Sequence, residues 1–377
     1  MFLLLMIFFV LLLYSWAQYK VKIAFQHGSA KQNRTYLTCG IGILILLACF
    51  RGLNVGNDTR SYYNLFLYYT GQANIQNLSS AALGWMSSIE IGYKLLNKYF
   101  GIFTHNYQLF ISFVAILSYW ILGRFIKKYS ANVALSLILA FLMFYSAYMN
   151  LLRQVLALSI VLVSFDSLNK NKCIRFVMGV LIASFLFHRS AIICILLLPM
   201  AKHKCSKKFI WISIGISMVI VGLGQIPSII SFFNISTGYT DIAAGSSIIF
   251  SIIKNSGILL FSWYLNNENW KCSSSGIEES ELNNDVAGNL TSWLPFVSLL
   301  ISVCALGMPV ATRFELYFTV FLIVLIPRMV ALSTRMVSNI YIVVDILLFA
   351  LLLYNAGKIV YRPEWVTEFN YSFFWTR

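Results

Sequence analysis

Long apolar runs recur along almost the whole of this 377-residue chain, from residue 2 to residue 360. They have the length of a membrane-crossing helix, and no polar stretch between them is long enough to fold as a separate domain. Hydrophobic residues make up 59% of the sequence and charged residues only 11%, which is too little charge for a soluble surface. The sequence therefore predicts an all-α polytopic membrane protein, with residues 1–377 forming a single integral membrane domain.

The apolar runs predict about twelve transmembrane helices. Their expected ranges are 2–19, 36–50, 106–123, 131–149, 151–168, 176–188, 190–201, 209–224, 248–265, 291–310, 316–333 and 339–360. The first run is interpreted as a retained span and not as a signal peptide, because its lysines, Lys20 and Lys22, follow the apolar residues.

Basic residues gather in every second connection between these runs. Five such connections contain no acidic residue and hold these lysines and arginines: Lys20, Lys22, Lys31, Arg34; Arg124, Lys127, Lys128; Lys170, Lys172, Arg175; Lys202, Lys204, Lys207, Lys208; Arg328, Arg335. Basic loops stay in the cytoplasm, so the alternate connections and both termini are expected to face outward. The polar, acidic connection 266–290 is predicted to be a flexible cytoplasmic loop. The net charge of +15 thus reflects membrane topology, and no nucleic-acid partner is expected.

The longest outward connection covers residues 51–105. Apolar residues recur there with a helical period from Trp85 to Phe100, whereas Glu90, Lys94 and Asn97 fall on the opposite face. This pattern predicts an amphipathic helix on the outer leaflet, with its polar face turned away from lipid.

The hairpin from Phe176 to Ala201 is too short to cross the bilayer twice. Thirteen residues per leg reach about 20 Å as helix, against a hydrocarbon core of about 30 Å. Its tip, His188 and Arg189, should therefore lie below the outer surface, where only a watery cavity or packed protein can satisfy polar groups. This tip is predicted to be the floor of a site open to the outside.

Three arginines lie at the outer ends of predicted helices: Arg51, Arg153 and Arg313. The positive-inside rule places most arginine on the other side of a membrane, so three guanidinium groups at one depth on this side indicate an anionic ligand. Forked guanidinium groups suit a diphosphate, and the three are predicted to bind one. The alternative is that each arginine extends to a lipid headgroup at the end of its own helix.

Three other side chains on the outward side can accept a proton from a sugar hydroxyl: Asp58, Glu90 and His188. Each has a plainer alternative role. Asp58 can cap the helix that follows it, Glu90 can pair with Lys94 one turn away, and His188 can be a packed polar group. Lys254 and Asp345, a short way inside predicted helices, are intramembrane charges and so functional candidates, although each can reach its own interface.

Motifs for nucleotides and metals are missing from the sequence. There is no Gly-rich phosphate loop, dinucleotide fingerprint or Asp-x-Asp pair, the four histidines are scattered, and the seven cysteines fit no zinc spacing. No metal site and no cofactor are expected. A sugar donor used at the outer face must arrive already activated, which predicts a lipid-linked donor.

Six short motifs on the outward side resemble the EpsG family of polysaccharide polymerases, which includes O-antigen polymerases of the Wzy type. In order they are Phe50-Arg51, Gly56-x-Asp58-Thr59-x-x-Tyr62, Glu90-x-Gly92-Tyr93, Arg153-Gln154-x-x-Ala157, His188-x-Ser190-Ala191 and Arg313-x-x-x-Tyr317. The resemblance covers roughly residues 40–320. Where the family usually has proline after the histidine, this chain has Arg189.

The resemblance implies a multi-pass enzyme of the bacterial inner membrane with a GT-C-like helical architecture. Such an enzyme transfers a glycan from undecaprenyl diphosphate to a lipid-linked repeat unit at the periplasmic face, as in lipopolysaccharide O-antigen biosynthesis, without metal or nucleotide. The side chains expected to contact substrate are Tyr62, Tyr93, Gln154, Arg189 and Tyr317. Undecaprenyl-diphosphate-linked oligosaccharide and membrane lipid are the expected partners, together with a chain-length regulator protein.

Two other functions remain open from the residues alone. A lipid-linked oligosaccharide flippase has a similar number of spans, but it should carry charges along a cavity that reaches both faces. An outward-facing O-antigen ligase or acyltransferase shares the outward site and differs in its acceptor.

Overall fold

The computed structural model describes residues 30–73, 79–205, 207–222, 243–273, 286–306, 311–333, 340–361 and 363–376. Within these ranges every regular element is a helix. Six helices are long and apolar enough to cross a membrane: α6 (Tyr107–Tyr129), α7 (Val133–Asn150), α8 (Leu152–Asn169), α14 (Val286–Cys304), α15 (Thr312–Ser333) and α16 (Ile340–Tyr361). Shorter apolar stretches lie in α2 (Ala30–Cys49), α9 (Cys173–Leu186), α11 (Lys207–Gly222) and α13 (Ala243–Ser273). The chain is an all-helical, multi-pass membrane protein in its described part.

Eleven of the twelve predicted apolar ranges overlap helices of the structure, and the first, 2–19, lies outside the described residues. The total of twelve spans stays a prediction. The range 190–201 is not one α-helix: a 3-10 helix, η2 (Arg189–Leu196), is followed by the short α10 (Leu197–Lys202). A 3-10 helix rises about 2 Å per residue instead of about 1.5 Å, so this leg of the short hairpin reaches further than its length suggests.

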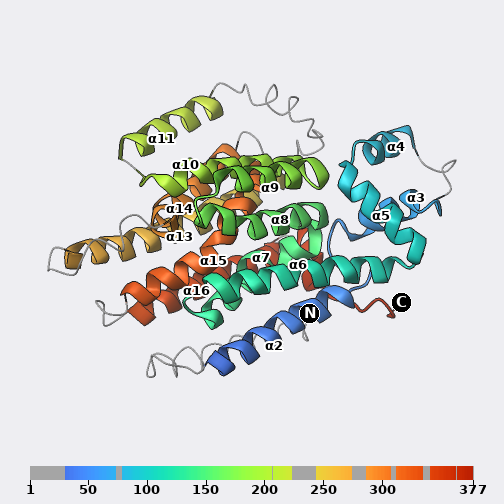
Figure 1. The fold of residues 1–377 in the computed structure, drawn as a ribbon, viewed down its shortest axis with the longest axis horizontal. Helices are drawn as coiled ribbons and strands as arrows, with labels where there is room; N and C mark the ends of the chain where they lie inside the picture. The colour runs from blue at the N-terminus through green and yellow to red at the C-terminus, as the bar shows by residue number, and fades with distance from the viewer. Residues whose placement is uncertain are drawn as a thin grey trace.

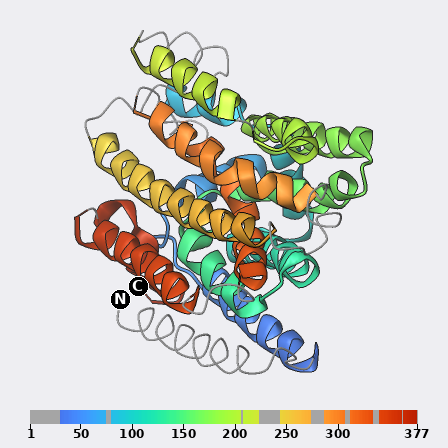
Figure 2. The ribbon, with the colours of Figure 1, turned by 90° about the vertical axis from the view of Figure 1, so that its left-hand side faces the viewer.

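Helix α15 lies in the middle of the bundle and packs against α7, α13, α14 and η2. Its apolar residues are buried on all sides, as expected for a helix enclosed by others. Figure 1 shows the long helices side by side, and Figure 2 shows α13 between α14 and α16. Because α15 is enclosed, polar residues in its first turn are held within the protein.

Three short helices gather at one end of the bundle: α3 (Thr59–Tyr69), α4 (Ser80–Ser87) and α5 (Ile91–Phe103), at the right of Figure 1. An aromatic cluster attaches them to the first turns of α6 and α8. In it the rings of Tyr62 and Tyr93 are 5.8 Å apart, and those of Phe66 and Phe110 are 5.1 Å apart. We refer to this region as the α3–α5 end.

The amphipathic helix predicted from Trp85 to Phe100 is interrupted. Helix α4 ends at Ser87, and Glu90 has extended backbone (φ −63°, ψ 145°) before α5 begins. Asn97, predicted on the polar face that turns away from lipid, is fully buried, and its Nδ2 donates to the Tyr93 carbonyl at 2.7 Å. The cause is packing: Tyr93, Asn97 and Gly101 form the protein-facing side of α5, where a Cβ on Gly101 would lie 2.5 Å from the Thr70 side chain.

The predicted loop 266–290 is shorter than expected, because α13 continues to Ser273 and α14 begins at Val286. The residues between these two helices lie outside the described part of the chain.

Beyond α16 the chain returns to the α3–α5 end. Residues 366–376, here called the C-terminal strap, run beside the loop that follows α2 (Figure 1). The Gly52 amide donates to the Ser372 carbonyl at 2.8 Å, and the Phe374 amide donates to the Phe50 carbonyl at 3.0 Å. The strap therefore holds the segment that leads into α3.

Candidate functional site

The loop before α3 is shaped by Gly56 and carries Asp58. Gly56 has φ +88°, and a Cβ there would lie 3.0 Å from the Met149 carbonyl. The amide of Asn57 donates to the Asn150 side chain, which ties the loop to the end of α7. Asp58 stands at the N-cap position of α3, but its backbone is helical (φ −93°, ψ −5°) and its side chain makes no capping hydrogen bond. Helix capping therefore does not account for this carboxyl group.

Glu90 pairs with Arg153 and not with Lys94. The Arg153 Nη1 lies 2.5 Å from Glu90 Oε2, and the two side chains are only 15% and 8% exposed. Lys94 donates instead to the Ser87 carbonyl at 2.6 Å. Because the pair is enclosed, removal of one partner would leave the other as a buried charge without compensation.

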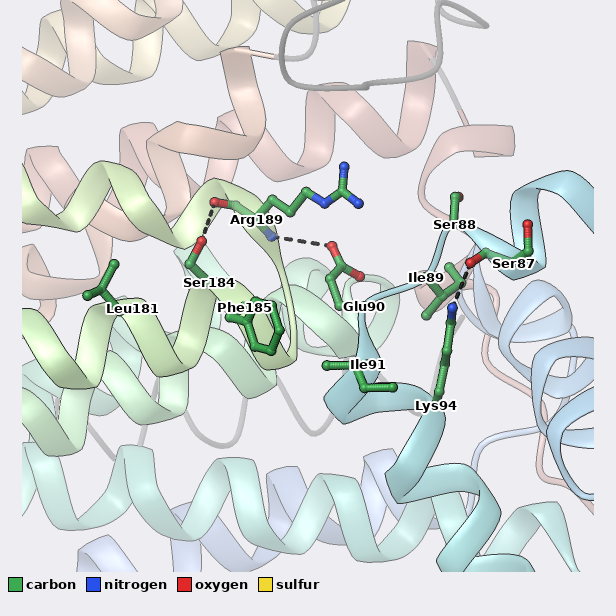
Figure 3. A pocket seen from close by; sticks show the side chains of 10 residues that line it. All are labelled: Ser87, Ser88, Ile89, Glu90, Ile91, Lys94, Leu181, Ser184, Phe185 and Arg189. Carbon is green, nitrogen blue, oxygen red and sulfur yellow. Dashed lines mark hydrogen bonds between the residues drawn. The ribbon is translucent and has the colours of Figure 1, made fainter.

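Gly92 brings Glu90 to the tip of the α9 hairpin. A Cβ on Gly92 would lie 2.5 Å from the Leu186 carbonyl oxygen, so only a residue without a side chain lets α5 approach the end of α9 this closely. As a result the backbone amide of Arg189 donates to Glu90 Oε1 at 3.3 Å, as Figure 3 shows. Both carboxylate oxygens of Glu90 thus have partners.

His188 begins a short chain of hydrogen bonds to α15. Its Nδ1 accepts from the Ser190 backbone amide at 3.4 Å and lies 2.5 Å from Ser190 Oγ, which is 3.4 Å from the Tyr317 hydroxyl. Burial lowers the pKa of His188 well below its ordinary value, and the charges of Arg153 and Arg313 lower it further. The imidazole is therefore neutral, and since Nδ1 is the acceptor, its hydrogen is assigned to Nε2.

Arg313 enters the site from the first turn of α15. The Gln154 side chain donates to the Arg313 carbonyl, which joins the starts of α8 and α15. Burial raises the pKa of Asp58, and the nearby guanidinium groups of Arg313 and Arg153 oppose this rise. The structure thus brings Arg153, Arg313, Asp58 and His188 together from four separate segments.

Arg51 is not part of this group. Its side chain is 1% exposed, and its Nη1 lies 3.0 Å from the Met149 sulfur. The C-terminal strap covers it, with an isolated backbone bridge between Arg51 and Phe373. Of the three guanidinium groups predicted to lie together, only those of Arg153 and Arg313 therefore belong to this group. Arg51 is excluded because the loop after α2 turns its side chain inward beneath the strap.

The predicted substrate-contacting residues fall into two classes. Tyr62, Tyr93, Gln154 and Tyr317 are buried, and they contact other residues of the site: Tyr62, for example, hydrogen-bonds to Arg153. These four buried side chains support the residues of the site. Arg189 is exposed, and its side chain extends over Glu90 toward Ser88 in Figure 3.

Arg189 lines a pocket of about 610 Å³ between α5, the end of α4 and α9 (Figure 3). Its lining residues are Ser87, Ser88, Ile89, Glu90, Ile91, Lys94, Leu181, Ser184, Phe185 and Arg189. Glu90 forms the wall between this pocket and Arg153. Within the described residues no three His, Cys, Asp or Glu side chains are grouped as metal ligands.

One ion pair near the site was missed by sequence reasoning. Lys254 is paired inside the protein: its Nζ lies 2.5 Å from Glu315 Oε1, and the two side chains are 10% and 7% exposed. Ser302 donates to the other oxygen of Glu315 at 3.0 Å. Glu315 is the acidic residue in the first turn of α15, two positions after Arg313, and this isolated acid within an apolar run is the signal that points to it. Asp345, the other intramembrane candidate, is half-buried on α16.

Comparison with known proteins gives one match. The sequence profile of the EpsG family matches residues 34–373, nearly the whole chain, and this range includes every residue of the site described above. No curated protein and no solved structure matches the chain. The length of the family match, with all six motifs inside it, shows that this protein belongs to the EpsG family.

Proposed function

We propose that this protein polymerises polysaccharide repeat units at the outer face of the bacterial inner membrane. In the proposed reaction a glycan leaves undecaprenyl diphosphate and joins a hydroxyl group on an incoming lipid-linked repeat unit. Membership of the EpsG family supports polysaccharide polymerisation. The observation that carries the proposal is that two guanidinium groups, Arg153 and Arg313, lie within electrostatic range of the Asp58 carboxyl group at the α3–α5 end.

The reaction breaks the bond between the anomeric carbon and the diphosphate, whose oxygen keeps the electron pair. Negative charge therefore grows on the leaving group, and prepositioned cations stabilise that charge in the transition state. We assign this role to Arg153 and Arg313. Glu90 holds Arg153 at 2.5 Å and so fixes the guanidinium before substrate arrives.

The acceptor hydroxyl loses its proton as its oxygen bonds to the anomeric carbon. Of the three candidate bases, Asp58 fits best. Glu90 already binds Arg153 and the Arg189 amide, and neutral His188 carries its hydrogen on Nε2 and uses Nδ1 for Ser190. Asp58 makes no capping bond, and burial raises its pKa, which makes its carboxylate a stronger base.

His188 acts in this scheme as a hydrogen-bond donor. Its Nε2–H can bind an oxygen of the departing diphosphate or of the acceptor sugar, and Ser190 holds the ring in place. Because the donor arrives activated on its lipid, the proposed reaction uses neither a nucleotide nor a metal ion.

The test is polymer formation in a deletion strain that expresses variants. Arg313→Ala should abolish the polymer ladder, and Arg313→Lys should restore it poorly, because lysine keeps the charge but loses the planar fork that grips two phosphate oxygens. Arg34→Ala removes a predicted cytoplasmic charge and should leave the ladder nearly normal. The proposal is contradicted by a normal ladder from Arg313→Ala at wild-type protein levels.

The same strain distinguishes a polymerase from a ligase. Loss of polymerisation leaves single repeat units on the lipid core, whereas loss of ligation leaves none. A flippase is distinguished by lipid translocation in vesicles that contain the purified protein.

A further inference from the structure

The pocket beside Glu90 has two chemically different walls. One wall is polar and carries Lys94, Arg189 and two serines of the turn after α4; the other is apolar and consists of Ile91, Leu181 and Phe185 (Figure 3). A pocket with both walls fits a ligand with a polar head and an apolar tail.

The polar wall has an excess of positive charge. Glu90 is the acidic residue among those that line the pocket, and its charge is matched from behind by Arg153 at 2.5 Å. Lys94 uses one donor on the Ser87 carbonyl, and an ammonium group has three. Lys94 and Arg189 together therefore favour an anionic head group.

The apolar wall continues along the exposed side of α9. Phe185 is 72% exposed and Leu181 is 41% exposed, and the exposed Met178 and Ile174 precede them on α9. Positions 174, 178, 181 and 185 follow the helical repeat, so they form one apolar stripe along the length of α9. A hydrocarbon tail that lies on this stripe places its head in the pocket.

We propose that this pocket binds the diphosphate of an isoprenoid lipid, and that this lipid is the acceptor substrate of the polymerase. The second statement rests on the proposed function. Polymerisation brings together two lipid-linked substrates, each with its own diphosphate. The donor diphosphate is assigned to Arg153 and Arg313, the acceptor diphosphate lies with Arg189 and Lys94, and Glu90 separates the two anions.

The experiment measures binding of farnesyl diphosphate to the purified full-length protein in detergent by calorimetry. Wild-type protein should bind it at least tenfold more tightly than either inorganic diphosphate or farnesol, because head and tail both contribute. The double variant Lys94→Ala with Arg189→Ala should weaken binding at least tenfold. Phe185→Ala should weaken it severalfold and leave the binding of inorganic diphosphate unchanged.

Two matched controls accompany these variants. Lys98→Ala removes an exposed charge from the same helix as Lys94, and Ile116→Ala removes an exposed apolar side chain from α6, which is not part of the α9 stripe. Both should bind farnesyl diphosphate within about twofold of wild type, with elution profiles and melting temperatures that match those of the double variant.

Three results would overturn the proposal. The first is unchanged affinity for farnesyl diphosphate in a folded Lys94 and Arg189 double variant, and the second is equal affinity for inorganic and farnesyl diphosphate. The third is competition by glucuronate, which would assign the pocket to an acidic sugar. If the double variant does not fold, the affinities of the single Arg189→Gln and Lys94→Gln variants for farnesyl diphosphate test the same prediction. These binding results do not depend on polymer formation. A normal ladder from Arg313→Ala with intact farnesyl diphosphate binding would remove the proposed reaction and leave the lipid pocket in place.

Discussion

Asp58 occupies the position from which an aspartate usually caps a helix, and its carboxyl group is not used in that way. An effective cap needs extended backbone, and the helical φ and ψ of Asp58 prevent the bond. This makes Asp58→Asn an informative change, since asparagine caps helices as well as aspartate does but cannot accept a proton.

We expect Asp58→Asn to reduce kcat by roughly 10²- to 10⁴-fold, the usual contribution of a general base. The melting temperature and the affinity for lipid substrate should stay close to those of wild type, because a base acts mainly in the transition state. Single-turnover assays with a synthetic lipid-linked repeat unit give both the rate constant of the reaction and the affinity for the lipid substrate. Wild-type turnover in Asp58→Asn would show that the carboxyl group is only structural.

The acid limb of the pH profile is a second prediction for Asp58. Burial raises the pKa of this carboxyl group, and only its ionised form accepts a proton, so activity is present above the raised pKa and is lost as pH falls through it. His188 has a pKa lowered well below its ordinary value, so it stays neutral and adds no inflection near pH 6.5. A kcat/KM profile from pH 4 to 8 tests both. An inflection near 6.5 that disappears in His188→Ala would make His188 the base instead.

Helices α13, α14 and α15 are joined by one buried polar network. Glu315 pairs with Lys254, Ser302 donates to Glu315, and Asn255 donates to Ser302 at 2.6 Å. All four side chains lie within apolar helices, where a polar group without a partner is costly. The network therefore fixes the first turn of α15, the turn that carries Arg313.

We expect Lys254→Met alone to destabilise the protein by about 3 kcal/mol, because Glu315 is then left buried and charged. The double variant Lys254→Met with Glu315→Gln removes both charges and should recover most of this loss. Thermal unfolding in detergent measures the coupling, and Lys128→Met, from an exposed ion pair with Asp166, is the control with little effect. Equal losses in the single and double variants would show that the two charges do not interact.

The ranges of the long helices were predictable from hydropathy, because the length of an apolar run is a property of the chain itself. The break at Glu90 was not predictable in this way, since it lies where Gly92 packs closely against the end of α9, a contact between segments far apart in the sequence. The same distinction holds in the site. Arg153 and Arg313 were identified by their positions at helix ends, whereas Arg51 occupies a similar position and is buried by the strap, a contact that no local pattern shows.

At the scale of the whole molecule, the basic loops predict that the α3–α5 end faces outward. Gln72 is exposed at that end, and Lys128 is exposed at the far end of α6, about 30 Å away for a helix of this length. In a cysteine-free background, Gln72→Cys should react with an impermeant maleimide in intact spheroplasts and Lys128→Cys should not. The reverse pattern would invert the topology and place the site on the cytoplasmic side.

The C-terminal strap also determines when the site can form during synthesis. Thr367 bonds to Asn57 across 310 positions, and Tyr371 bonds to Leu47 across 324. At usual translation rates the ribosome needs roughly 15 to 60 s to make the chain between these partners. Throughout that interval the early helices have entered the membrane while the Asp58 loop has no strap to hold it. A partly synthesised chain therefore lacks the contacts that hold the Asp58 loop, and these contacts form only after the strap has been made.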